Sequence, residues 1–140
     1  VEEFGRRSRY FNTFGGNPVS CAVGRAVLEV IDNEGLAANA GKVGAYMKAG
    51  LEKLAQRYEV IGDVRGAGLF LGVEFVTDRK TKEPNAMAAT HVVNDLRRRK
   101  VLISATGPGA NILKIRPPLV FTQEHADIFL DATEKALAGI

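Results

Sequence analysis

The sequence predicts a mixed α/β fold of the α+β type, in which helices pack on a small mixed or antiparallel sheet. Three observations predict it. Apolar residues recur at helical spacing in four segments, they alternate with period two over residues 69–76, and two short apolar runs flank a Gly- and Pro-containing loop at 106–111. Segregated helices over a small sheet that contains a tight strand pair argue against a doubly wound nucleotide-binding fold.

The composition is that of a globular protein with its own core. The 140 residues are 46% hydrophobic and 25% charged, and the net charge is +3, which alone does not indicate a nucleic-acid partner. A single cysteine excludes a disulfide scaffold and a zinc module, so we expect no metal. No apolar run approaches the roughly 20 residues of a membrane span, and no signal peptide is recognisable. We expect a cytoplasmic protein with no membrane partner.

Two helices are predicted in the first part of the chain. Residues 1–16 are expected to be irregular, after which Asn17 is placed to cap a helix and Pro18 to occupy its first position. Apolar residues follow at i, i+3 and i+4 as far as Ile31, and the segment 33–35 ends the helix. A longer and more regular apolar stripe over 36–58 predicts the second helix.

The remainder contains the strands and two further helices. Alternation predicts a strand over 69–76, followed by a polar turn at 78–84. A helix is expected from about residue 87 to the basic run 97–100. Short strands are expected at 101–104 and 112–116, with the latter stopped by two prolines. Thr122 is placed to cap the last helix, whose apolar spacing extends to Leu137.

Most candidates for chemistry have a simpler structural interpretation. Gly66 and Gly68 precede a strand, whereas phosphate-binding glycine loops lie between a strand and a helix, so we interpret them as a backbone bend. The basic run 97–100 complements a helix dipole. His91 and His125 have no nearby ligand partners and are expected on helix surfaces. Cys21 is expected to pack against neighbouring residues.

Two features are less easily explained in this way. Residues 12–18 place the hydroxyl of Thr13 and small residues just before a helix N-terminus, where exposed amides favour an anion such as phosphate. Arg116 ends an otherwise apolar strand and precedes Pro117 and Pro118, which restrict the chain as it leaves the sheet. A guanidinium held there can bind a carboxylate or a phosphate, although an exposed strand-end cation is an equally good interpretation.

Three segments, in this order and spacing, resemble class III (omega-type) pyridoxal-phosphate aminotransferases. They are residues 11–22 (FNTFGGNPVSCA), 62–74 (GDVRGAGLFLGVE) and 113–119 (LKIRPPL). The resemblance extends over nearly the whole chain and is to the C-terminal part of the family. It implies the small domain of a fold type I enzyme, with pyridoxal 5'-phosphate as cofactor and an active site at a homodimer interface.

The resemblance also implies roles for individual residues. Thr13 and Phe14 match the cofactor-binding segment, in which the threonine reaches the cofactor phosphate of the neighbouring subunit. Arg116 matches the arginine that holds the substrate carboxylate in many members. Residues 1–34 correspond to the end of the large domain, including the phosphate loop and a connector helix, and residues 35–140 to the small C-terminal domain.

No catalytic residue can be assigned, because the family's Schiff-base lysine lies upstream of Thr13 and residues 1–12 contain no lysine. We therefore expect this chain to be inactive alone, as part of a longer enzyme that also supplies the large domain. The expected reaction transfers an amino group between an amine or amino acid and an oxo acid. The loop at 104–111 is similar to that of phospho-lyases of phosphorylated amino alcohols, which is one alternative. A freestanding, non-catalytic domain that binds an anion or a protein partner is another.

Overall fold

The computed structural model describes residues 2–140, which divide into two compact units at residues 34 and 35. The predicted α+β class is confirmed: helices accompany a four-stranded sheet whose three strand pairs are all antiparallel.

The first unit begins with a short helix, α1 (Glu2–Arg7). The expectation that residues 1–16 are irregular is therefore wrong for this segment. Its acidic side chains occupy the first turn and its basic ones the last turn, which favours a helix through the backbone dipole. Arg7 Nε also lies 2.5 Å from Glu3 Oε1, one turn away.

The second helix of this unit, α2 (Pro18–Asn33), begins as predicted. Asn17 Oδ1 accepts the N–H of Ser20 at 2.9 Å, and Pro18 holds the first helical position. None of its residues is buried. Cys21, expected to pack, is exposed. The larger apolar side chains along α2 are exposed as well, and they are Val19, Val23, Val27, Leu28 and Val30.

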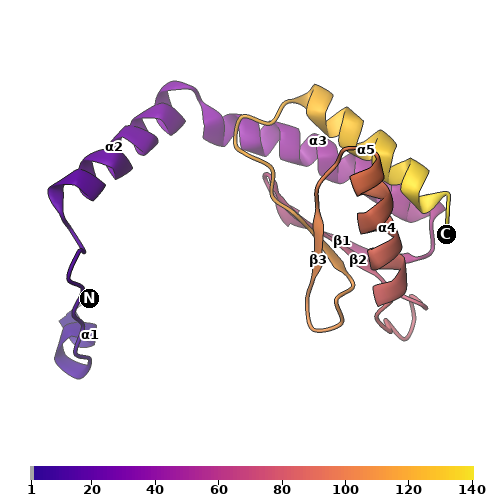
Figure 1. Cartoon of the computed structure of the whole chain (residues 1–140), viewed down its shortest axis with the longest axis horizontal. Helices are drawn as coiled ribbons and strands as arrows, with labels where there is room; N and C mark the ends of the chain where they lie inside the picture. Colours follow the sequence, from indigo (N-terminus) through magenta and orange to yellow (C-terminus); the bar gives the residue numbers. More distant parts are fainter. Residues whose placement is uncertain (1) are drawn as a thin grey trace. The chain divides into compact units, whose positions relative to one another are not determined.

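The second unit holds the sheet and three helices (Figure 1). The chain forms α3 (Leu36–Arg57), β1 (Ile61–Ala67), β2 (Phe70–Phe75), α4 (Ala86–Arg98), β3 (Ser104–Thr106), β4 (Ile112–Ile115) and α5 (Gln123–Leu137). The strands are ordered β1-β2-β4-β3, so β4 inserts between β2 and β3.

The three helices cover one face of the sheet and form the core with it (Figure 1). Alternate residues of β2 and β4 point into this core because successive side chains of a strand lie on opposite faces. The fully buried side chains include Met47, Leu51, Phe75, Val92, Leu96, Leu113 and Leu137. The other face of the sheet carries charged side chains, including Asp63, Arg65 and Glu74, together with the exposed Phe70, and no helix of residues 35–140 covers it.

A close backbone approach joins α3 to the turn between β1 and β2. A Cβ added to Gly44 would lie 2.0 Å from the carbonyl oxygen of Gly68, which is far inside a van der Waals contact. Gly68 itself has a φ of +53°, in the left-handed region. The helix can therefore pack on this turn only because Gly44 has no side chain.

Arg79, in the turn after β2, binds the end of α3. Its Nε donates to the carbonyl oxygens of Glu59 and Ile61, both at 3.1 Å, and its Nη2 donates to those of Tyr58, at 3.1 Å, and Ala55. Carbonyls at a helix C-terminus lack intrahelical partners, so the guanidinium satisfies groups that would otherwise face solvent.

Two strands differ from the sequence-based prediction. β1 was not predicted, because its seven residues include two glycines, an aspartate and an arginine, and it shows no clear alternation. It lies at an edge of the sheet, where few of its side chains need to be apolar. The strand predicted at 101–104 begins instead at Ser104 and extends to Thr106.

Candidate functional site

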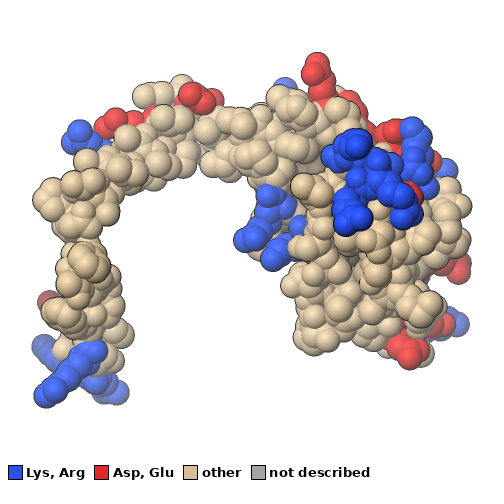
Figure 2. Space-filling model, in the orientation of Figure 1, with Lys and Arg blue, Asp and Glu red and all other residues tan. Residues whose placement is uncertain are grey.

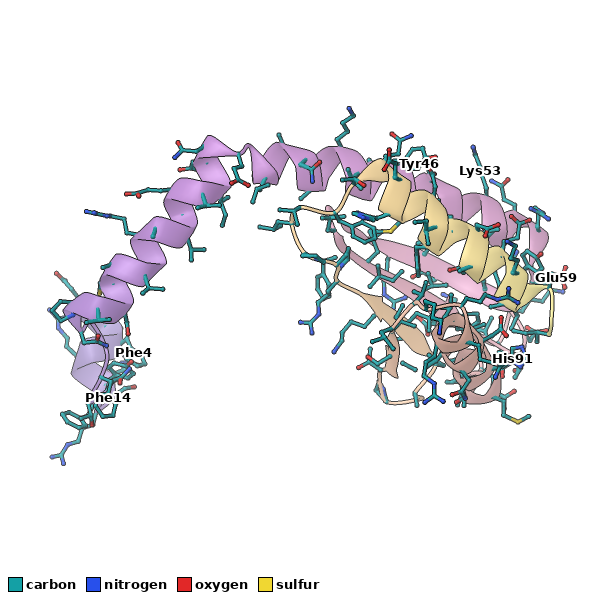
Figure 3. The ribbon with its side chains drawn as sticks, turned by 45° about the horizontal axis from the view of Figure 1, so that its top comes forward. Phe4, Phe14, Tyr46, Lys53, Glu59 and His91 are labelled. Carbon is teal, nitrogen blue, oxygen red and sulfur yellow. The ribbon has the colours of Figure 1, made fainter. Side chains whose placement is uncertain are left out.

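The turn before α2 is fixed by two asparagines. Asn12 Oδ1 accepts the N–H groups of Phe14, at 3.2 Å, and Gly15, at 3.0 Å. Asn17 Nδ2 donates to the carbonyl oxygen of Phe14 at 2.6 Å. The hydroxyl of Thr13 takes no part in the hydrogen bonds of the described residues, and Thr13 is exposed. Phe14 is exposed as well (Figure 3). Residues Thr13 and Phe14 therefore stand on a defined turn with their side chains free.

The hydroxyl of Thr13 is a better candidate donor to a phosphate oxygen than the backbone amides at the start of α2 are. Pro18 has no N–H, and the N–H of Ser20 is taken by Asn17, so in the first three positions of α2 only Val19 has a free amide. The start of α2 therefore offers an anion few free N–H groups, because Asn17 already binds one of them and Pro18 has none. A free hydroxyl on a fixed turn still fits as one donor of a phosphate site built from several segments.

Arg116 lies in the second unit, directly after β4. The following proline restricts its backbone to an extended conformation. Asn39 of α3 holds the next segment, donating to the carbonyl oxygens of Leu119 at 2.8 Å and Phe121 at 3.0 Å. Arg116 is exposed and forms no ion pair among residues 2–140. Its position is therefore fixed while its charge is not compensated.

Arg116 lines a pocket of about 660 Å³ that lies between the ends of β3 and β4 and the first half of α5. Lys100 and Lys114 line the same pocket, and no Asp or Glu does. Apolar side chains complete the wall, including the highly exposed Leu102. An anionic molecule with an apolar part would match this combination of charge and surface.

Lys114 and Lys100 line the pocket as well, and neither was predicted from the sequence. Lys114 could have been found, because Leu113 and Ile115 are apolar and alternation places Lys114 and Arg116 together on the opposite face. Lys100 could not, since its role depends on a backbone φ of +69° just after α4.

His125 also lines the pocket, and it caps α5 in addition. Its Nδ1 accepts the backbone N–H of Thr122 at 3.2 Å, while Thr122 Oγ1 accepts the N–H of His125 at 3.4 Å. Thr122 was predicted as the cap, but its reciprocal partner was not. Because Nδ1 acts as an acceptor, the neutral imidazole carries its proton on Nε2.

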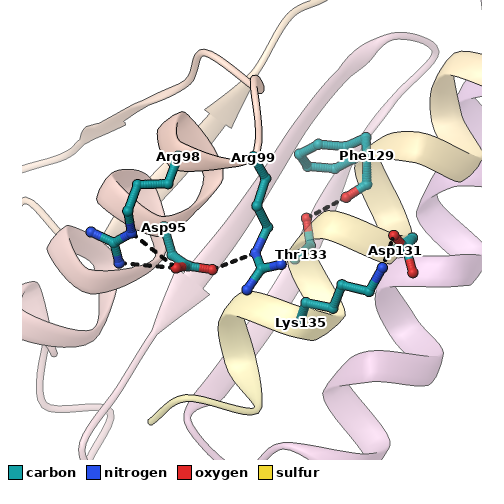
Figure 4. Close-up of polar contacts among 7 residues, drawn as sticks. All are labelled: Asp95, Arg98, Arg99, Phe129, Asp131, Thr133 and Lys135. Carbon is teal, nitrogen blue, oxygen red and sulfur yellow. Dashed lines mark hydrogen bonds and ion pairs between the residues drawn. The ribbon is translucent and has the colours of Figure 1, made fainter.

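The basic run at the end of α4 is partly compensated. Figure 2 shows Lys and Arg side chains gathered over this end of the helix. Asp95 forms ion pairs with both arginines: its Oδ1 lies 2.9 Å from Arg98 Nη2, and its Oδ2 lies 2.6 Å from Arg99 Nε (Figure 4). Hydrogen bonds from Arg99 and then Arg98 lower the pKa of Asp95. These contacts support the interpretation of the run as a helix end with its own counter-ion.

The open face of the sheet carries a second compensated cation, Arg65. Its Nη1 lies 2.5 Å from Asp63 Oδ2 and 2.6 Å from Glu74 Oε2. Hydrogen bonds to Asp63 and then Glu74 raise the pKa of Arg65. Gly66 follows with a φ of +125°, so the glycines of this segment serve backbone geometry, as predicted.

No group of three or more His, Cys, Asp or Glu side chains in the described part of the chain could hold a metal ion. None of the helices of residues 2–140 is long and apolar enough to cross a bilayer. The second unit is thus a mixed α/β fold with a pocket lined by three cations, Lys100, Lys114 and Arg116, and by no carboxylate.

A family model, aminotransferase class-III, matches residues 3–137. The chain therefore belongs to the class III aminotransferases, a family that depends on pyridoxal phosphate.

Curated relatives agree with this membership and differ in their named activities. The chain is 48% identical over 132 residues to an alanine–glyoxylate aminotransferase 2-like protein of Drosophila melanogaster, covering 94% of the chain and 27% of the relative. It is 41% identical over 126 residues to an ethanolamine-phosphate phospho-lyase homologue of Caenorhabditis elegans, covering 89% and 27%. The chain thus spans about a quarter of the length of these relatives.

Solved structures show the same likeness. A phospholyase from Arthrobacter in complex with phosphoethanolamine superposes with a TM-score of 0.88 at 47% identity, covering 99% of this chain and 33% of that one. An amine transaminase from an uncultivated Pseudomonas species, in a pyridoxal-phosphate-bound form, gives 0.84 at 34% identity, with 97% and 31% covered.

Proposed function

We propose that this chain contributes two parts to a longer, pyridoxal-phosphate-dependent class III enzyme that transfers an amino group between an amine or amino acid and an oxo acid. Residues 1–34 supply the phosphate turn and the connector helix, and residues 35–140 form the small domain. The observation that carries the proposal is Arg116, which is held at a pocket that contains three cations and no carboxylate. Family membership supports the reaction class.

Each part has a distinct task in this proposal. The Thr13 hydroxyl donates a hydrogen bond to a phosphate oxygen of the cofactor, and Phe14 contacts the cofactor beside it. When bound, pyridoxal phosphate supplies the electron sink for chemistry at the substrate carbon that bears the nitrogen. Arg116 binds the anionic group of the substrate and so orients its amino group. A guanidinium does this well because its two parallel N–H groups match a carboxylate.

The complete protein is further proposed to be a homodimer, with Thr13 and Phe14 serving the partner subunit's cofactor. The lysine that binds the cofactor covalently is proposed to lie in the large domain. The chain of residues 1–140 alone is then without transaminase activity.

A second candidate function is a phospho-lyase reaction on a phosphorylated amino alcohol. The likeness to the Arthrobacter phospholyase, which was solved with phosphoethanolamine, favours it. A phosphate group would bind Arg116 as well as a carboxylate does, so both candidates use the same pocket.

The test uses the complete protein and separates the two sites. Thr13→Ala is expected to weaken retention of the cofactor, measured by its absorbance after dialysis, with Thr13→Ser as the conservative control. Arg116→Ala is expected to raise KM for the anionic substrate by about tenfold or more, because a hydrogen-bonded charge pair is lost. Arg97→Ala, which removes an exposed cation outside the pocket, is the matched control. Normal cofactor retention in Thr13→Ala together with normal kinetics in Arg116→Ala would contradict both assignments.

A further inference from the structure

Two uncompensated cations lie two residues apart, on β4 and directly after it. Leu113 and Ile115 of β4 are buried in the core, so Lys114 projects from the opposite face, and Arg116 follows the last residue of the strand. Residues two apart on a strand are separated by roughly 7 Å, which is within reach of a single small anion for two long side chains. Both line the same pocket.

The strand neighbours of Lys114 are small residues. It pairs with Gly72 of β2 on one side and with Ser104 of β3 on the other. A Cβ added to Gly72 would make ordinary van der Waals contacts, with Ile112 at 3.5 Å and Arg65 at 3.8 Å. Ser104 also lines the pocket and supplies a neutral hydroxyl.

The cations of this face differ in how their charge is balanced. Arg65, also on the open face and paired with Gly72, is held between Asp63 and Glu74. Lys114 and Arg116 form no ion pair with any residue that the structure describes. Two like charges so close together repel each other, and a ligand with a single negative charge would compensate only one of them.

We propose that Lys114 is a substrate-binding residue that, together with Arg116, selects a doubly charged phosphomonoester group on the substrate over a singly charged group. This inference rests on the proposed function and names the substrate class rather than the reaction. A phosphomonoester carries close to two negative charges above its second pKa of about 6, and it has three terminal oxygens. Arg116 binds two of these oxygens through its planar guanidinium, and the ammonium of Lys114 binds the third.

The test measures binding rather than turnover, on the complete protein loaded with cofactor. Calorimetric titration at pH 8 compares methyl phosphate, a dianion, with dimethyl phosphate, a monoanion that keeps the tetrahedral phosphate centre. The wild-type protein is expected to bind methyl phosphate more tightly. Lys114→Met is expected to weaken methyl phosphate about tenfold, equivalent to about 1.4 kcal/mol, and dimethyl phosphate less than about twofold.

Two further variants control for charge and for folding. Lys114→Arg keeps the charge and is expected to retain most of the preference, with an unchanged melting temperature. Lys53→Met removes an exposed cation on α3, away from the pocket (Figure 3), and is expected to change neither affinity.

Three outcomes would overturn the inference. They are an absent preference in the wild-type protein, an equal loss of both ligands in Lys114→Met, and a loss of cofactor absorbance in that variant, which would assign Lys114 to the cofactor phosphate instead. None of these outcomes depends on the Thr13→Ala and Arg116→Ala measurements, so the proposed function can stand while this inference fails.

Discussion

Helices α2 and α3 carry similar apolar stripes, but the stripe of α3 is buried in the core and that of α2 is not. In α3 the stripe is buried, with Met47 and Leu51 fully inaccessible to solvent. In α2 no residue is buried: Val23 and Val27 of the stripe remain 59% and 53% accessible, and Leu28, on another side of the helix, remains 63% accessible. Apolar periodicity predicts a helix with one face to be covered, but it does not say which part of a protein covers it.

The exposed apolar face of α2 indicates that other protein covers this helix. A contiguous apolar face on a well-formed helix is typical of a surface that packs against other protein. In the proposed enzyme, α2 is the connector between the domains, so we expect the large domain to cover it. The following predictions use matched substitutions in the two units, from the largest expected effect to the smallest.

The largest contrast is expected between two leucines. Leu51→Ala leaves a cavity in the core and should lower the free energy of unfolding by about 2–5 kcal/mol. Leu28→Ala removes an exposed side chain and should change it by less than about 0.5 kcal/mol. Urea denaturation of the 140-residue chain, followed by circular dichroism, measures both.

The same pair of leucines sharpens the comparison in the complete protein. If the large domain covers α2, Leu28→Ala should become clearly destabilising there, while the cost of Leu51→Ala stays the same. An equally small effect of Leu28→Ala in both forms would show that the side of α2 that carries Leu28 is not covered.

Replacing a glycine by alanine is expected to destabilise the protein at Gly44 and to stabilise it at Gly24. Gly44→Ala would force a methyl group onto the Gly68 carbonyl and should destabilise the second unit by roughly 1–3 kcal/mol. Gly24 of α2 has no atom within 4 Å of its added Cβ, so Gly24→Ala should stabilise α2 by up to about 1 kcal/mol. Thermal unfolding measures the first, and hydrogen exchange of the α2 amides the second. Equal effects at the two positions would contradict the packing described for α3.

The smallest effect concerns surface charge in the second unit. Because Arg99 and Arg98 lower the pKa of Asp95 from its ordinary value of 3.8, this carboxylate stabilises the fold at higher pH. The contribution is fully present above pH 3.8 and is lost as the pH falls through the lowered value. An NMR titration of the Asp95 carboxyl should give a midpoint below 3.8 that moves upward in Arg99→Gln. A midpoint at or above 3.8 in the wild-type chain would contradict the geometry of the ion pairs.

Sequence patterns predicted the helices better than the strands. Asn17 and Thr122 fixed helix starts because capping depends on a few adjacent residues. Edge strand β1 was missed because pairing with β2, rather than its own composition, keeps it extended. Helix α1 was missed because six residues give too short a window for apolar periodicity.

The candidate site was predictable only where it depends on adjacent residues. Arg116 was a candidate because of the adjacent prolines and the family resemblance, and both are visible in the sequence. The joint position of Lys114, Lys100 and His125 at one pocket depends on how β4, the end of α4 and α5 meet, which no local pattern encodes. The internal use of the α2 amides by Asn17 likewise appears only once its side chain is placed.

The contacts of Arg79 bear on the order in which the chain assembles during synthesis. They join residue 79 to carbonyls only 18 to 24 positions earlier, so the loops they close are short and their entropic cost is small. The end of α3 and the β1–β2 hairpin can therefore dock while later segments are still being made. β4, which lies beside β2 in the finished sheet, is translated some 35 residues after Arg79. Until it arrives, one edge of β2 stays unpaired, and this is the stage at which the nascent chain is most exposed to wrong strand pairing.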